Sequence, residues 1–183
     1  MQDNLFFSLV LNISLLVLMA TVLTELRPLR MMLKHQQRSA ENQLFLGVIF
    51  GLLSISSTYT GLSFQGAVVN TRVVSTMAAG LVGGPVSGIC AGLISGMHRY
   101  LYNPEGFTSL ACAIGTFFFG IIGAASCRWF NRRARRTHDL VLLTVFAELL
   151  QCLLILLLSK PFTAALALEK AILLPKILVN SIG

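Results

Sequence analysis

Residues 83–100 read GGPVSGICAGLISGMHRY, an apolar stretch in which glycine recurs at every fourth position before the chain reaches a charge. The recurring glycines are Gly84, Gly88, Gly92 and Gly96. Glycines four residues apart lie near one face of a helix, and in an apolar helix that face lets another backbone approach closely. The stretch ends at His98-Arg99-Tyr100, and Arg72 lies upstream. Because an arginine at membrane depth costs about 2.5–3.5 kcal/mol or more, the sequence predicts a tight helix hairpin that holds two functional or partnered arginines near each other.

The composition is that of a polytopic membrane protein. Of the 183 residues, 55% are hydrophobic and only 11% are charged; the mean hydropathy is +0.79. Soluble domains average about 25% charged residues. The first residues, Met1-Gln2-Asp3-Asn4, lack the basic start of a secretory signal. We therefore expect the first apolar run to remain as a membrane span, and we expect no large soluble domain within these residues.

The formal charge of +7 comes mainly from two short basic loops. One loop carries Arg27, Arg30, Lys34 and Arg38, and the other carries Arg128, Arg132, Arg133, Arg135 and Arg136. Basic residues that flank apolar spans mark the cytoplasmic side of the membrane. They can also contact anionic lipid, at about 1 kcal/mol per residue. The placement therefore predicts membrane lipid as a partner and argues against a nucleic-acid surface.

The sequence contains seven apolar segments. They cover residues 5–24, 44–60, 65–82, 85–101, 108–127, 139–159 and 162–182. The third and fourth are short, since a full span needs about 17–25 residues. Gly83-Gly84-Pro85 separates them, because proline disfavours helix at the preceding residue and removes an N–H group. A single helix over 65–101 would also be about 55 Å long, whereas the bilayer core is about 30 Å thick. We therefore expect two antiparallel elements, either full spans or a re-entrant pair buried by its neighbours.

The two basic loops support this interpretation independently. With the first loop in the cytoplasm and residues 65–101 folded as a hairpin, the second loop also reaches the cytoplasm, as the positive-inside rule requires. A single span over 65–101 would place the second loop outside. The sequence thus predicts an all-α membrane protein: a bundle of about seven transmembrane segments with a short glycine-rich helix hairpin. Its N-terminus would lie outside and its C-terminus in the cytoplasm.

Under this topology, polar side chains converge near the outer ends of the third to fifth segments. The candidate ligand-binding residues are Asn70, Arg72, His98, Arg99, Thr108, Cys112 and Thr116. The last three are four residues apart, so they share one helix face. Arginine suits paired hydrogen bonds to a carboxylate, and few acidic residues lie nearby, so the site favours a small anion. Each of these features also has a purely structural interpretation. The glycines alone indicate close helix packing, and Arg99 could extend its side chain to the membrane interface. Cys112 alone could be a core residue, and His98 a surface residue.

Glu148 lies in the middle of the sixth apolar segment. A carboxylate there is costly and should be paired or protonated. Lys170 and Lys176 in the last segment are its candidate partners. The alternatives are a structural lock between helices and a role in proton coupling or signalling. Pro175 is expected to kink the last segment, where Asn180 could hydrogen-bond a neighbouring helix.

The sequence contains no catalytic or metal-binding constellation. There is no P-loop, no HExxH and no serine placed with a credible base. The four cysteines, Cys90, Cys112, Cys127 and Cys152, lie in or at the ends of apolar segments, where cysteine usually behaves as a small hydrophobe. We therefore expect no disulfide framework, no metal, no cofactor and no enzymatic activity from this chain.

A series of short motifs resembles the multi-span sensor domain of LytS-type histidine kinases, which also occurs ahead of some diguanylate cyclases. The series comprises Asn70-Thr71-Arg72, Gly83-Gly84-Pro85, the glycine ladder, His98-Arg99-Tyr100, Gly106-Phe107-Thr108 and Cys112, and the resemblance covers residues 40–183. It implies a ligand site lined by Arg72, Arg99 and Cys112, and a short-helix arrangement similar to that of transporter S-components. Pyruvate-sensing relatives carry a serine three residues after that cysteine, where this chain has Gly115 followed by Thr116.

The resemblance implies a sensing function in a bacterial cytoplasmic (inner) membrane. Residues 1–40 would form an N-terminal transmembrane helix and a basic cytoplasmic loop, and residues 41–183 the ligand-sensing domain. A small carboxylate such as pyruvate would bind near the outer side and signal to a cytoplasmic histidine kinase domain outside this chain, through which the protein would form a homodimer. Two alternatives remain open: a small-anion transporter or its substrate-binding membrane subunit, which a broken hairpin also suits, and a purely structural membrane subunit.

Overall fold

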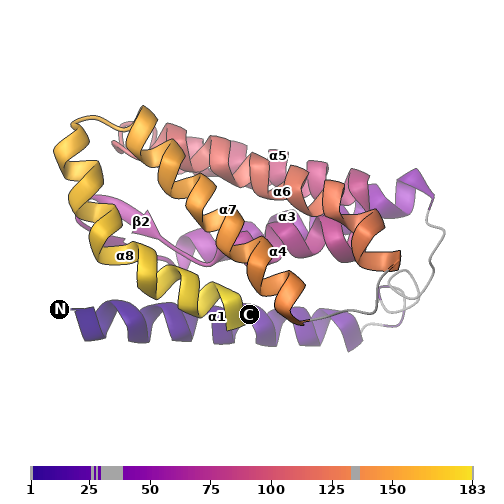
Figure 1. The fold of residues 1–183 in the computed structure, drawn as a ribbon. Coiled ribbons are helices and arrows are strands. Elements are labelled where there is room, and N and C mark those ends of the chain that lie inside the picture. The colour runs from indigo at the N-terminus through magenta and orange to yellow at the C-terminus, as the bar shows by residue number, and fades with distance from the viewer. Residues whose placement is uncertain (1, 26, 28, 30–38, 133–136, 183) are drawn as a thin grey trace.

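The structure, a computed structural model, describes residues 2–25, 27, 29, 39–132 and 137–182 (Figure 1). Within these residues the chain forms seven α-helices, one π-helical turn and one two-stranded β-hairpin. The α-helices are α1 (Gln2–Glu25), α3 (Ala40–Tyr59), α4 (Arg72–Ala78), α5 (Pro85–Tyr102), α6 (Ser109–Arg132), α7 (Thr137–Leu158) and α8 (Phe162–Ile182). The predicted helical bundle is therefore confirmed.

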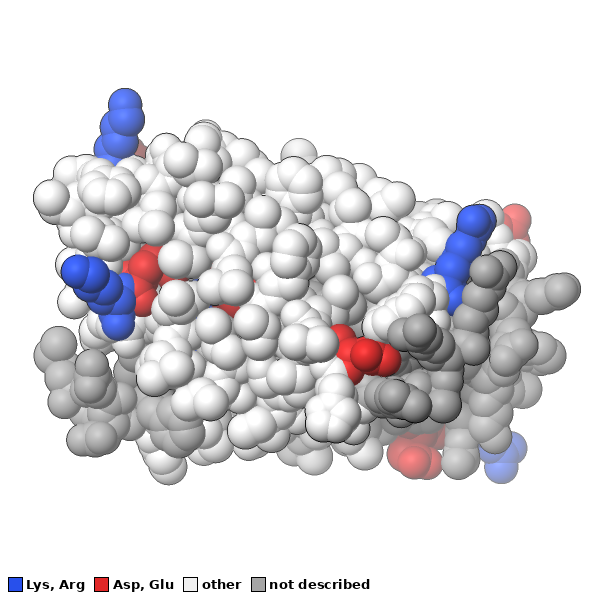
Figure 2. Space-filling model, viewed as in Figure 1, with Lys and Arg blue, Asp and Glu red and all other residues white. Residues whose placement is uncertain are grey.

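Three of the described helices, α3, α6 and α7, are long and apolar enough to cross a membrane, judged by length and composition. On the face shown in Figure 2, most charged side chains lie toward the two ends of the molecule and the middle is largely uncharged. Both observations fit a multi-pass membrane protein. The count of seven full spans stays a prediction: α4 and the turn that follows it cover only residues 72–83, about 18 Å of rise.

The third apolar segment, predicted over residues 65–82, begins as a β-hairpin. Strand β1 (Leu62–Phe64) pairs antiparallel with β2 (Ala67–Val69). The two residues between the strands, Gln65 and Gly66, have φ values of +49° and +79°, as a tight hairpin turn requires. The expectation of an all-α chain is therefore wrong at this hairpin, because the turn and the extended residues beside it delay the start of the helix.

The predicted break between the third and fourth elements is confirmed. Helix α4 continues into the π-helical turn η1 (Ala79–Gly83). Gly84 follows with φ of +106°, a conformation that favours glycine. Pro85 then occupies the first turn of α5, where its missing N–H costs no helical hydrogen bond. Gln43 at the start of α3 holds this break, because its Oε1 accepts the backbone N–H of Val86 at 3.1 Å.

The glycine ladder packs mainly against α6. A Cβ added at Gly88 would lie 2.6 Å from the carbonyl oxygen of Gly120, and one added at Gly96 would lie 2.8 Å from that of Ala113. The same Cβ at Gly88 would lie 2.7 Å from the Cα of Gly80 in η1. The predicted close backbone approach is thus confirmed, and it involves both the preceding element and the following helix.

The elements alternate in direction along the bundle. Helices α5 and α6 are antiparallel, since position 88 meets 120 and position 96 meets 113. Helices α7 and α8 are antiparallel as well, because Glu148 pairs with Lys176, whereas Cys152 further along α7 interacts with Glu169 earlier on α8. This alternation brings the flanks of both basic loops to one end of the bundle (Figure 1), as expected from the positive-inside rule. Six of the basic residues fall outside the described part of the chain: Arg30, Lys34, Arg38, Arg133, Arg135 and Arg136.

Candidate functional site

A small cavity lies where β2 meets helices α4, α6, α7 and α8. Its polar lining residues are Asn70, Arg72, Thr108, Cys112, Thr116, Glu148, Gln151 and Lys176. Its interior volume is about 30 Å³, and a single water molecule needs about 10–15 Å³ of such volume. The cavity therefore has room for a group of only a few heavy atoms.

Helix α6 contributes one face to the cavity, as its sequence spacing predicts. Cys112 and Thr116 on α6 line it, and so does Thr108, the residue before the helix, whose carbonyl accepts the N–H of Cys112 at 2.8 Å. The hydroxyl of Thr116 donates to the carbonyl of Cys112 at 2.7 Å, so that hydroxyl is already engaged. The Oγ1 of Thr108 is buried and has no hydrogen-bond partner among the described residues. Thr108 therefore offers a hydrogen-bonding group to whatever enters.

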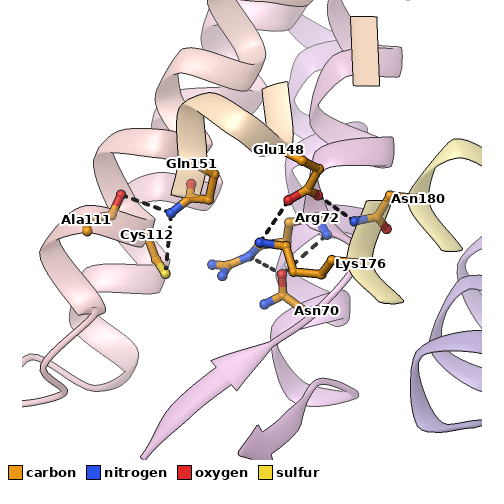
Figure 3. A network of polar contacts seen from close by, with 8 residues as sticks. All are labelled: Asn70, Arg72, Ala111, Cys112, Glu148, Gln151, Lys176 and Asn180. Carbon is orange, nitrogen blue, oxygen red and sulfur yellow. Dashed lines mark hydrogen bonds and ion pairs between the residues drawn. The ribbon is translucent and has the colours of Figure 1, made fainter. Parts of the chain in front are cut away.

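Arg72 supplies a cation at the first residue of α4. Its side chain is buried, and its Nε donates to Oδ1 of Asn70 at 3.0 Å (Figure 3). The Nη1 of Arg72 is buried without a hydrogen-bond partner among the residues that the structure describes. Burying a charged donor is costly unless it is satisfied. Asn70 thus orients the guanidinium and leaves part of its donor capacity for an anion.

A second charged group reaches the cavity from α7 and α8. The Nζ of Lys176 lies 2.8 Å from Oε2 of Glu148, and Nδ2 of Asn180 donates to Oε1 of the same carboxylate at 2.6 Å (Figure 3). The predictions of Lys176 as partner and of Asn180 as a hydrogen-bonding residue are confirmed. Lys170, the other candidate, is exposed. Glu148 therefore locks two helices together and also lines the cavity.

Two predicted site residues, Arg99 and His98, are not among the residues that line the cavity. Arg99 is 1% exposed and its Nη1 donates to Oγ of Ser109 at 3.3 Å. Ser109 in turn donates to the carbonyl of Asn103, so Arg99 braces the loop that leads into α6. Its charge still interacts with that of Arg72. His98 is half-buried, with Nε2 3.3 Å from the Tyr59 hydroxyl, and its ring packs against Tyr59.

Gln151 also lines the cavity, although it is not among the residues predicted from the sequence. Its Nε2 donates to the carbonyl of Ala111 at 3.4 Å and lies 3.7 Å from Sγ of Cys112 (Figure 3). The available signal was its position three residues after Glu148, which places both on one helix face. A Cβ added at Gly115 would overlap the Gln151 amide. Because Gly115 has no side chain, the Gln151 amide can occupy the space beside it.

Helix α1 also connects to the site, through Asn12, which is not among the residues predicted from the sequence. The Oδ1 of Asn12 accepts the hydroxyl of Thr60 at 2.8 Å and that of Thr71 at 3.4 Å. Thr71 is the residue before Arg72, and its hydroxyl lies 3.3 Å from that of Ser57 on α3. These buried bonds tie α1 and α3 to the start of α4.

Comparison with known proteins identifies the family. The 5TMR region of the 5TMR-LYT family matches residues 26–183. Sensor protein LytS of Bacillus cereus is 31% identical over 98% of this chain and 33% of its own length. Sensor histidine kinase BtsS of Escherichia coli K12 is 34% identical over 74% of this chain and 25% of its own length. A third relative, sensor histidine kinase YpdA of the same strain, is 29% identical over 90% of this chain and 29% of its own length.

The chain thus spans about a third or less of these curated relatives. No solved structure matches it. The family match covers more than half of the chain and includes every residue that lines the cavity. This chain therefore belongs to the 5TMR-LYT family, the membrane sensor domain of LytS-type and BtsS-type histidine kinases.

Proposed function

We propose that this chain senses a small carboxylate, such as pyruvate, that binds in the cavity beside Arg72. The observation that carries the proposal is the buried Nη1 of Arg72, which lacks a hydrogen-bond partner among the described residues and borders a cavity of matching polarity. Arginine binds carboxylates through paired, charge-assisted hydrogen bonds. Thr108 would bind a second oxygen, and Cys112 and Thr116 would contact the rest of the molecule.

The charge of the interior favours a single negative charge on the ligand. Among the described residues, the buried ionisable side chains of the bundle are three basic and two acidic: Arg72, Arg99, Lys176, Glu148 and Glu169. With ordinary ionisation they carry a net charge of +1. One carboxylate would neutralise this excess, whereas a dicarboxylate would reverse it at low dielectric, where charge imbalance is costly. The small cavity volume favours a molecule of few heavy atoms as well.

The sensing role also follows from the relatives, two of which are named as sensor histidine kinases. We propose that the whole protein carries a cytoplasmic kinase domain and forms a homodimer through it. The chain would sit in the bacterial inner membrane with its N-terminus outside. Residues 41–183 would form the sensing unit, after an N-terminal helix and basic loop at residues 1–40. A ligand that contacts α4, α6, α7 and α8 would shift the output by binding one packing of these helices more tightly than another.

The test is a pyruvate titration of the purified chain in detergent by calorimetry and thermal shift. Arg72→Gln should weaken binding at least about tenfold, or about 1.4 kcal/mol. Lys170→Gln removes an exposed charge and serves as the matched control, with affinity expected to stay at the wild-type value. Methyl pyruvate, which lacks the charge, should not bind. Equal binding by wild type and Arg72→Gln would refute the proposal.

The transport alternative is tested with the same protein in liposomes. A sensor should bind labelled pyruvate saturably without carrying it across the membrane. Accumulation of label inside vesicles that contain only this chain would favour a transporter instead. A structural membrane subunit would show neither saturable binding nor sensitivity to the Arg72 substitution.

A further inference from the structure

We propose that Lys176 is a second cationic contact for the bound carboxylate, and that binding transfers this lysine from Glu148 to the ligand. The transfer would weaken the polar contact between α7 and α8. Ligand binding would in this way change how the C-terminal part of α8 packs against α7. This inference rests on the proposed carboxylate function and adds to it a competitor for the ligand and a route for the signal.

The first support is the placement of the pair. Lys176 and Glu148 line the same cavity as Arg72, although they come from different helices. In Figure 3 the Lys176 side chain reaches from α8 toward Glu148 and the Arg72 side chain. Both members of the pair are buried. A carboxylate that binds the guanidinium therefore enters the space that the ammonium group of Lys176 already borders.

The second support is the chemistry of the present partner. Glu148 is itself a carboxylate, and its Oε2 lies 2.8 Å from Nζ of Lys176. It therefore occupies the lysine in the way that a bound carboxylate would. Its Oε1 keeps the hydrogen bond from Asn180 when the lysine turns away. After the exchange, Lys176 pairs with the ligand while Glu148 keeps a hydrogen-bond donor in Asn180.

The third support is where these bonds lie along α8. Lys176 and Asn180 are one helical turn apart and both bind the Glu148 carboxylate, so this side chain fixes the position of α8 against α7. Asn180 lies two residues before the end of α8 at Ile182. The exchange would remove the bond at Lys176 and keep the bond at Asn180, so that only one of these two polar contacts would still hold the C-terminal part of α8 to α7.

The test compares pyruvate affinity in Glu148→Gln, in Lys176→Met and in the double variant that carries both changes. Glu148→Gln removes the competitor, so pyruvate should bind about tenfold more tightly. The proposed exchange only moves the ammonium group within the cavity, whereas Lys176→Met removes it altogether. This variant therefore leaves a buried carboxylate without a countercharge and is expected to unfold readily. The double variant removes both charges together, so it should stay folded and bind pyruvate about tenfold more weakly than the wild type. Lys170→Met, at an exposed position of the same helix, is the control.

A measurement on the wild-type protein keeps the proposal falsifiable if the variants do not fold. Infrared difference spectra, recorded with ¹³C-labelled pyruvate to shift the ligand bands away, should show a protein carboxylate band that changes on binding. Glu148→Gln should lose this band. A double variant with wild-type affinity would overturn the proposal, and so would the absence of any protein carboxylate change on binding.

The two proposals fail in different ways. If the wild type does not bind pyruvate, the proposed function fails and the inference falls with it. If the wild type binds and Arg72→Gln does not, but the double variant binds like the wild type, only the role of Lys176 is refuted.

Discussion

Alanine substitutions within the glycine ladder should differ in their effect on stability, in an order set by the packing of α5 on α6. A Cβ at Gly88 would lie 2.6 Å from the carbonyl oxygen of Gly120 and 2.7 Å from the Cα of Gly80. Both contacts are backbone atoms, which cannot rotate away. At Gly92 the nearest atom is the carbonyl oxygen of Phe117, at 3.1 Å, so a shift of a few tenths of an ångström relieves the contact.

The magnitudes follow from two opposing effects. Overpacking a close contact costs about 1–3 kcal/mol, while replacing glycine by alanine inside a helix gains about 1 kcal/mol. Because both contacts at Gly88 are with backbone atoms, its cost lies toward the upper end, at about 2–3 kcal/mol. Gly88→Ala should therefore lower the free energy of unfolding by about 1–2 kcal/mol. For a chain of this size, about 1 kcal/mol corresponds to about 2–4 °C in Tm. Gly92→Ala should leave Tm close to the wild-type value, because the helix gain offsets its milder contact.

The assay is thermal unfolding of the purified protein in detergent, followed by circular dichroism. Both variants change the same residue type on the same helix, so each controls for the other. Equal destabilisation by the two substitutions would refute the packing described for α5 and α6. A larger loss for Gly92→Ala would refute it as well.

Two further outcomes follow from the contacts around the cavity. Gly115→Ala should displace the Gln151 amide from the cavity wall and change pyruvate affinity at least about threefold. Tm should change little, because the higher helix propensity of alanine offsets the weak hydrogen bonds that Gln151 loses. Unchanged affinity in calorimetry would contradict this. Asn12→Leu should remove the acceptor for Thr71 and lower the stability by about 1–2 kcal/mol for the two hydrogen bonds lost. Ser14→Ala is the matched control in the same thermal assay, because the Ser14 hydroxyl donates to the carbonyl of Val10 within α1. Equal Tm values for the Asn12→Leu and Ser14→Ala variants would contradict the role of Asn12.

The sequence predicts those parts of the fold that depend on local backbone chemistry. Gly84 and Pro85 mark the break because one needs a positive φ and the other lacks an N–H, and both properties act within one or two residues. The β-hairpin at residues 62–69 was not predicted, because a short apolar run fits a strand and a buried helix equally well. Each strand has only three residues, so alternation between polar and apolar positions is too short to decide between them.

The candidate site likewise contains some residues that local spacing predicts and others that depend on packing between distant segments. Thr108, Cys112 and Thr116 could be predicted to share a surface because helical spacing alone determines which face they occupy. Gln151 and Lys176 could not be assigned to that surface, since the meeting of α6, α7 and α8 depends on packing between distant segments. The orientation of Arg99 was equally out of reach, because its partner Ser109 lies on the helix after a loop.

By neutralising the excess positive charge inside the bundle, the proposed carboxylate would tie the amount of folded protein to the supply of that ligand. A molecule that binds only the folded state adds RT ln(1 + [L]/Kd) to its stability, which is about 2.7 kcal/mol at a concentration of 100 Kd. A substitution elsewhere that costs about 2 kcal/mol would thus be masked in cells rich in the carboxylate and revealed in cells that lack it. The abundance of the sensor in the membrane, as well as its signalling state, would then follow the metabolite.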